Sequence, residues 1–102
     1  MNDFEFADNQ AQHRFEIRLG TTVAGYAEYN QLKDALLFTH TEVAPEFEGK
    51  GVGSRLAKGA LDQVRSRGLH AIPQCQFIAG YIRKHAEYLD LVSDEHRRAY
   101  RL

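Results

Sequence analysis

Three glycines at alternate positions, Gly49, Gly51 and Gly53, constrain the fold of this chain more than any other feature. They follow a run with strand-forming composition, 35–43, and they lead into a segment, 52–67, whose apolar residues recur at helical spacing. Glycine adopts backbone conformations that a side chain forbids, and it lets the backbone approach another group closely. The order of strand, glycine loop and helix therefore predicts a tight turn, at which several N–H groups of the helix lack an internal partner.

The chain before this turn predicts an antiparallel meander of three strands. Apolar and charged residues alternate over 13–19, and a tight hairpin turn is expected at Gly20. The next strand, 23–29, is rich in aromatic and small residues, and the third strand is the run 35–43. Short turns between consecutive strands are typical of antiparallel pairing.

The chain after the turn is expected to return to the same sheet. Gly68 ends the first helix, and a short strand, 69–73, follows it. Such a strand–helix–strand unit normally has a right-handed connection and two parallel strands. A second helix is expected over 76–86, and the tail 93–102 is expected to add a short helix capped by Ser93. The sequence therefore predicts an α/β fold with a mixed sheet, in which an antiparallel meander precedes a β-α-β unit.

Length and composition restrict the class of protein further. A chain of 102 residues predicts one domain, 1–102, with its core over about 13–92 and a loose polar arm over 1–12. Thirteen basic and fourteen acidic residues give a net charge of -1, which argues against a nucleic-acid binder. A lone cysteine, Cys75, fits a reducing compartment, and no apolar run is long enough to span a bilayer. We therefore expect a cytoplasmic protein with no nucleic-acid partner, no membrane partner and no metal site.

The glycine loop has the features of an anion-binding site. The N–H groups and the dipole at a helix start favour negative charge, and Lys50 and Arg55 add positive charge from the flanks. A Walker A loop is excluded because Lys50 precedes Gly51, and a dinucleotide fingerprint is excluded because Leu56 stands where the third glycine is needed. The template that fits is the Gly-x-Gly turn used for the pyrophosphate of coenzyme A. The alternative is that the glycines only shape a turn after Pro45.

Four short blocks, in order and at sensible spacing, resemble the GCN5-related N-acetyltransferase superfamily, and above all its minimal single-domain members. The resemblance covers about residues 13–92. The blocks are His40-Thr41-Glu42-Val43, Glu48-Gly49-Lys50-Gly51-Val52-Gly53-Ser54, Pro73-Gln74-Cys75-Gln76-Phe77 and Ile82-Arg83-Lys84-His85-Ala86-Glu87-Tyr88-Leu89-Asp90-Leu91. Any one of them is a weak signal, but the four together are specific.

The resemblance implies that the strands 35–43 and 69–73 splay apart and hold acetyl-CoA in the wedge between them. The pantetheine arm is then expected to bond to the backbone near Glu42 and Val43, where an N–H group would serve as the oxyanion donor. The pyrophosphate is expected on the amides of the glycine loop. The cofactor-binding residues that the resemblance implies are Glu42, Val43, Gly49, Lys50, Gly51, Val52, Gly53, Ser54, Phe77, Arg83 and Lys84.

Glu48 departs from the pattern of the wider superfamily, which usually has Arg or Gln at this position. A pyrophosphate repels a carboxylate. Glu48 is therefore expected to turn away, and Lys50 to supply the positive charge in its place. Phe77, Arg83 and Lys84 are expected near the pantetheine and nucleotide ends of coenzyme A.

Acetyl transfer to an amine needs a base, an oxyanion donor and an acid for the leaving thiolate. The candidate base is His40, because an imidazole titrates near neutrality; the alternative is an ordinary strand residue that shares a face with Phe38. Cys75 is expected near the thioester, either as an acetyl acceptor, as a thiol acid, or as a small buried residue that lines the cavity. Tyr81 and Tyr88 are alternative proton donors, and Tyr81 is expected in the core.

The sequence therefore predicts an N-acetyltransferase that passes the acetyl group directly from acetyl-CoA to an amine in a ternary complex. The acceptor is left open among a small molecule, a peptide N-terminus and a lysine side chain. The chain is too short for the extra strands that usually build an acceptor pocket, so the alternative is a module that binds acyl-CoA without transferring the acyl group. A third hypothesis is an interaction domain with a structural glycine turn.

Overall fold

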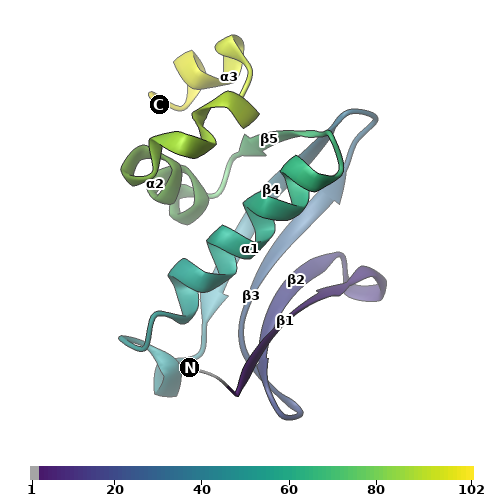
Figure 1. Ribbon diagram of the computed structural model, residues 1–102, viewed down its shortest axis with the longest axis vertical. Coiled ribbons are helices and arrows are strands. Elements are labelled where there is room, and N and C mark those ends of the chain that lie inside the picture. The colour runs from purple at the N-terminus through teal and green to yellow at the C-terminus, as the bar shows by residue number, and fades with distance from the viewer. Residues whose placement is uncertain (1–2) are drawn as a thin grey trace.

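The computed structural model describes residues 3–102, and five strands of this part form a single mixed sheet in the order β1-β2-β3-β4-β5 (Figure 1). The strands are β1 (Phe4–Asn9), β2 (Arg14–Leu19), β3 (Thr22–Gln31), β4 (Ala35–Val43) and β5 (His70–Pro73). The first four pair antiparallel with their neighbours, and β5 pairs parallel with β4. The predicted α/β fold with a mixed sheet is confirmed.

The α-helices occupy the regions that the sequence pattern predicts, whereas the short 3-10 helices were not predicted. The α-helices are α1 (Val52–Ser66), α2 (Gln76–Lys84) and α3 (Asp94–Ala99), and the 3-10 helices are η1 (Gln10–Gln12), η2 (Pro45–Phe47) and η3 (Ala86–Leu91). Helix α1 lies along one face of the sheet, and α2 and α3 gather beyond the end of the sheet that β5 forms (Figure 1). The Oγ of Ser93 accepts a hydrogen bond from the N–H of His96, so the predicted cap of α3 is present. Among the described residues, no helix is both long enough and apolar enough to cross a membrane.

The predicted loose arm over 1–12 is wrong, because residues 4–9 form the edge strand β1. This strand pairs with β2 along its whole length, from Phe4 opposite Leu19 to Asn9 opposite Arg14. The ring of Phe6 stacks on Phe15 and lies against Gly59 of α1, where any side chain would collide with it. Alternation of apolar and polar residues extends only over 4–6, and the surrounding residues are mostly polar, so the pattern is too short to predict this strand. Residues 1–2 lie outside the described part.

One apolar core joins the sheet to the helices. Its largest fully buried side chains come from β2, β4, α1 and α2: Phe15, Ile17, Leu36, Phe38, Leu56, Leu61, Ile78 and Ile82. Each buried side chain of this size contributes about 1.5–3 kcal/mol through the area that it removes from water. The core therefore fixes α1 and α2 relative to β4, which is the strand that carries the candidate site.

A β-bulge in β4 changes which side chains face the core. Phe38 lies opposite Tyr29 and His40 lies opposite Glu28, so Thr39 is an extra residue without a partner in β3. Phe38 is fully buried, whereas half of the His40 side chain is exposed. The prediction that these two side chains share a face is wrong, because simple alternation along a strand takes no account of an extra residue.

The sheet face opposite α1 is polar, and we call it the polar face. Its residues are Arg14, Glu16 and Arg18 of β2, Tyr26 and Glu28 of β3, and His40 and Glu42 of β4. Glu16 is 1% exposed, and its carboxylate accepts hydrogen bonds from Arg14 Nε at 2.6 Å, Arg18 Nε at 2.6 Å and Asn9 Nδ2 at 2.9 Å. Burial alone raises the pKa of Glu16, but these hydrogen bonds outweigh it and hold the pKa below its usual value. The polar face is thus ordered by charge pairing.

Candidate active site

The glycine loop folds as the glycine spacing predicts. Gly49 and Gly51 have φ angles of 79° and 77°, which lie in the left-handed region that favours glycine. Gly51 is the N-cap of α1, and no side chain caps this helix start. The N–H groups of the first turn of α1 therefore remain available to an anion, and the dipole of a fifteen-residue helix favours negative charge there.

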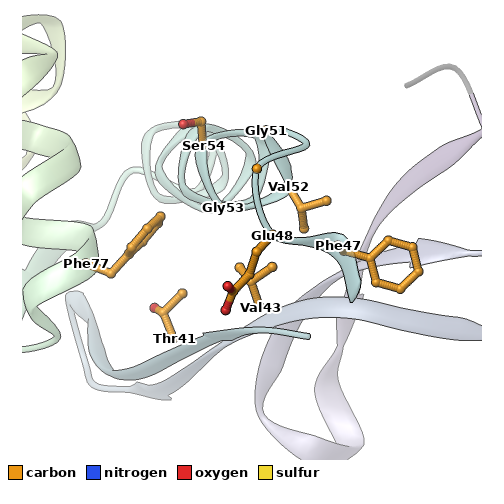
Figure 2. Close-up of a pocket in the computed structure, with 10 residues that line it drawn as sticks. Thr41, Val43, Phe47, Glu48, Gly51, Val52, Gly53, Ser54 and Phe77 are labelled. Atoms are coloured by element: carbon orange, nitrogen blue, oxygen red, sulfur yellow. The ribbon is translucent and has the colours of Figure 1, made fainter. Parts of the chain in front are cut away.

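A pocket of about 420 Å³ opens at this helix start, and we call it the loop pocket (Figure 2). It lies between the glycine loop, the end of β4 and the start of α2. Its lining residues are Thr41, Val43, Phe47, Glu48, Gly49, Gly51, Val52, Gly53, Ser54 and Phe77. Its walls combine apolar side chains with backbone amides, which suits a ligand that has an anionic part and an aliphatic part.

The end of β4 presents free backbone groups to the loop pocket. β5 pairs with β4 only as far as Phe38 and Pro73, and beyond this pair β4 has no neighbour on that side among the described residues. The N–H of Ala44 bonds to β3, so in an antiparallel ladder the backbone groups of Thr41 and Val43 point away from β3. They therefore face the gap that opens where β4 and β5 diverge.

Phe77 closes one side of the loop pocket. Its side chain comes from α2 and is 43% exposed, although the helical pattern places it with the apolar residues of that helix. The ring lies over Gly53, where an added Cβ would be 2.6 Å from Phe77 Cζ. Gly53 is thus required for close approach rather than for its φ angle. A hollow of about 270 Å³ on the far side of Phe77 is lined by Ser54, Tyr81 and Lys84, among others.

Cys75 lies at the vertex from which β4 and β5 diverge. It lies two residues after the end of β5 and is the N-cap of α2, and its side chain is 8% exposed. Its N–H donates to the carbonyl of Phe38 at 2.9 Å, and its thiol donates to Thr41 Oγ1 at 3.1 Å. Because Thr41 lines the loop pocket, the Cys75 thiol is one hydrogen bond away from that pocket.

His40 lies on the polar face and lines neither the loop pocket nor the hollow beside Phe77. Its Nε2 is 3.8 Å from Glu42 Oε1, and its ring centroid is 6.0 Å from that of Tyr26. Tyr26 in turn donates to Glu42 Oε2 at 2.7 Å, and this hydrogen bond raises the pKa of the Tyr26 phenol. The two predicted catalytic residues, His40 and Cys75, therefore lie on opposite faces of β4.

A second pocket, of about 680 Å³, lies where β3 begins and β4 ends, and we call it the strand-end pocket. Polar-face side chains of Arg14, Tyr26 and Glu42 contribute to its wall. Thr41, Val43 and Glu48 line both this pocket and the loop pocket. The two pockets therefore adjoin each other along the end of β4.

The remaining predicted binding residues are distributed unevenly. Glu42 lines the strand-end pocket and Lys84 lines the hollow beside Phe77, whereas Lys50 lines none of these cavities. Arg83 donates to the carbonyls of Tyr100 at 2.7 Å and Arg101 at 3.3 Å, so its guanidinium holds the end of the chain. The predicted residues that line the loop pocket are Val43, Gly49, Gly51, Val52, Gly53, Ser54 and Phe77.

Three lining residues of the loop pocket were missing from the predicted binding set. The local sequence does not predict that Thr41 lines the pocket, because its side chain faces α1 only as a result of the bulge at Thr39. Phe47 is an apolar residue in a polar loop, which is a usable signal, and its ring packs edge-on against Phe4 at 5.8 Å. Glu48 also lines the loop pocket, although it was expected to turn away from the anion. Its side chain extends from the loop toward β4 (Figure 2).

The two tyrosines considered as proton donors lie outside the loop pocket. Burial and then a hydrogen bond to Asp62 raise the pKa of Tyr88, whose hydroxyl donates to Asp62 Oδ1 at 2.7 Å. Burial also raises the pKa of Tyr81, which is partly buried at the edge of the core. Both phenols are therefore held in their neutral form away from the glycine loop.

Comparisons with known proteins identify the family and support the fold. The sequence model of a family described as GCN5-related N-acetyl-transferase matches residues 14–91. Protein NATD1 from Xenopus tropicalis is 38% identical over 53 residues, which are 50% of this chain and 49% of that protein, so the match spans about half of the relative. A GCN5-like protein from Staphylococcus aureus, solved by NMR, has the same fold, with a TM-score of 0.68 and 24% identity over 91% of both chains. Because the family match extends over most of its length, the chain belongs to the GCN5-related N-acetyltransferase family.

Proposed function

We propose that this chain transfers the acetyl group of acetyl-CoA directly to an amine in a ternary complex. The observation that carries the proposal is the loop pocket, in which the uncapped start of α1 faces the free edge of β4. One end of the pocket suits a pyrophosphate, and the other suits an extended amide chain such as pantetheine. The residues that would hold the pyrophosphate are Gly51, Val52, Gly53 and Ser54, and those that would hold pantetheine are Thr41 and Val43.

The reaction then runs across the end of β4. The amine nitrogen attacks the carbonyl carbon of the thioester, the backbone N–H of Val43 stabilises the oxyanion, and the C–S bond breaks. His40 takes the proton that the amine loses, because it lies on the face opposite the loop pocket, from which an acceptor can approach. Cys75 supplies a proton to the departing thiolate through Thr41, with which its thiol is bonded. In this direct route Cys75 itself is not acetylated.

The first test measures how strongly acetyl-CoA binds when a substitution strains the glycine loop. Valine at position 51 would have to adopt a φ of 77°, a left-handed conformation that costs about 1–2 kcal/mol and displaces the loop amides. We expect Gly51→Val to weaken acetyl-CoA binding by about tenfold or more, measured by calorimetry and thermal shift. Gly20→Val is the matched control, because Gly20 has a φ of 60° and its turn lies outside the loop pocket.

The control separates loss of stability from loss of the site. Both variants should melt at lower temperature, but only Gly51→Val should lose the stabilisation that acetyl-CoA gives. ATP and NAD serve as competing anions in the same measurement. Equal acetyl-CoA affinity in the wild type and in a folded Gly51→Val variant would contradict the pyrophosphate assignment.

A second function, binding of acyl-CoA without transfer, is favoured by one observation. His40 and Cys75 are not brought together in one pocket. Release of coenzyme A thiol in the presence of a panel of amines separates the two functions. A transferase requires turnover that falls in His40→Ala and Cys75→Ala, while a binding module gives none. The intact mass of the protein after incubation with acetyl-CoA shows whether Cys75 carries an acetyl group.

A further inference from the structure

The strand-end pocket is placed where an acceptor would have to bind. It lies where β3 begins and β4 ends, and it shares Thr41, Val43 and Glu48 with the loop pocket. A molecule in the strand-end pocket therefore lies beside the free edge of β4, while acetyl-CoA occupies the loop pocket. The pocket also borders the polar face, where His40 pairs with Glu42. This placement rests on the proposed function, because it takes the loop pocket as the donor site.

The charged groups of the strand-end pocket are two carboxylates and one guanidinium. Arg14 is already occupied, because its Nε bonds to Glu16 at 2.6 Å and its guanidinium stacks over the Tyr26 ring at 4.5 Å. Glu42 is held in place through one oxygen, Oε2, by the Tyr26 hydroxyl at 2.7 Å. Its other oxygen, Oε1, lies 3.8 Å from His40 Nε2, and 58% of the side chain is exposed.

Glu48 places a second carboxylate at the same pocket. Its side chain extends from the glycine loop toward β4 and is exposed (Figure 2). Two exposed carboxylates against one guanidinium that is already paired leave the pocket with a surplus of negative charge. Such a surplus attracts a cation and repels a carboxylate.

We propose that the strand-end pocket binds the acceptor, and that the acceptor is an alkylamine with a second positive charge, which Glu42 and Glu48 recognise. Tyr26 is a positioning residue, since its hydroxyl fixes the carboxylate of Glu42. The same chemistry is offered by a free polyamine and by a lysine side chain within a basic peptide. Either source places one ammonium group on the carboxylates and one amine beside the free edge of β4.

The test compares two acceptors of equal length that differ in the charge at one end. Cadaverine has an amine at each end, and 5-aminopentanoate has a carboxylate in place of one aminomethyl group. We expect kcat/KM for cadaverine to exceed that for 5-aminopentanoate by about tenfold or more, since a hydrogen bond to a charged group contributes about 1.5–3 kcal/mol. Spermidine and a lysine-rich peptide, measured in the same way, distinguish a free polyamine from a lysine side chain.

Substitution of the carboxylate identifies the pocket. Glu42→Gln keeps the size and the backbone, and it should raise KM for cadaverine by about tenfold and reduce the preference over 5-aminopentanoate to the part that Glu48 supplies. Glu46→Gln is the matched control, because Glu46 is exposed on η2 and lines neither pocket. Equal kcat/KM for the two acceptors, or an unchanged KM in Glu42→Gln, would overturn the proposal.

A binding measurement keeps this proposal separate from the proposed function. Failure of the proposed function would appear as no coenzyme A binding or as no turnover with any amine. In that case, cadaverine is titrated into the isotope-labelled protein and the amide signals are followed by NMR. Shifts at Tyr26 and Glu42 that 5-aminopentanoate does not produce would support the acceptor site, and their absence would overturn it.

Discussion

Glu48 carries the only charge among the three residues that line both pockets, and its effect on the two ligands should be opposite. Near a pyrophosphate its carboxylate is repulsive, whereas near an ammonium group it is attractive. The side chain is exposed, so solvent and salt screen both effects.

We therefore expect Glu48→Gln to bind coenzyme A about threefold more tightly and to have a KM for cadaverine about threefold higher, as exposed charge pairs contribute up to about 1 kcal/mol. Calorimetry with coenzyme A and steady-state kinetics with cadaverine measure the two changes. The difference should shrink as salt is added. A change of both constants in the same direction would show that Glu48 acts on the shape of the loop and not through its charge.

At the scale of elements, the contact between α1 and α2 sets the shape of the loop pocket. Phe77 of α2 rests on Gly53 of α1, and no side chain at position 53 fits beneath the ring. Alanine suits a helix better than glycine by about 1 kcal/mol, so Gly53→Ala should not unfold the domain. The ring must instead move out of its place beside the glycine loop.

We expect Gly53→Ala to lower the affinity for coenzyme A about tenfold, and Phe77→Ala to lower it by a similar factor, because both remove the same wall. The double variant should be little worse than either single variant. Calorimetry on the four proteins forms a double-mutant cycle. Additive losses in that cycle would mean that the two residues contact the ligand independently.

Much of the element order can be read from the sequence, because it is set by local patterns. The helical spacing of apolar residues locates α1, alternation locates β2, and a composition rich in aromatic and small residues locates β3. The glycine loop is predictable for a local reason too, since only glycine readily adopts the φ angles of positions 49 and 51.

The parts that escape prediction depend on contacts between distant segments. The bulge at Thr39 is defined by how β4 pairs with β3, so the sequence of β4 alone does not predict it. The strand-end pocket and the shared role of Glu48 follow from that pairing and from the path of the glycine loop. Prediction from the family pattern placed Arg83 near the cofactor, whereas its guanidinium binds carbonyls at the end of the chain.

For the molecule as a whole, paired carboxylates predict how stability depends on pH. Burial raises the pKa values of Asp8, Glu16 and Asp62, but hydrogen bonds outweigh it and leave all three pKa values below their usual range. A pKa that is lower in the folded state adds stability above its unfolded value and loses it as the pH falls through the folded value. The free energy of unfolding should therefore fall as the pH drops below about 4.5, the unfolded value for glutamate.

Urea unfolding at several pH values tests this expectation. Glu16→Gln should destabilise the protein by about 3 kcal/mol at pH 7, because it leaves two arginines without their shared carboxylate. Its stability should also depend less steeply on acid than that of the wild type. Parallel acid profiles for the wild type and Glu16→Gln would contradict the role given to Glu16.

At alkaline pH, the relevant group is Tyr29. Burial and a hydrogen bond to Asp8 raise the pKa of Tyr29 to about 12, so the stability that this side chain contributes persists below pH 10 and is lost toward pH 12.

The bulge in β4 has a consequence for how this chain tolerates changes of length. Thr39 shifts the alternation of β4 by one residue. Every side chain after it therefore lies on the face of the sheet opposite to the one that an unbulged strand would give. With Thr39 deleted, Glu42 would be brought round to the face that α1 covers, and Val43 would move out toward water. Under the proposed function, a single residue of length thus keeps the donor site apart from the acceptor site, and relatives with this fold should conserve that length more strictly than the identity of the residue.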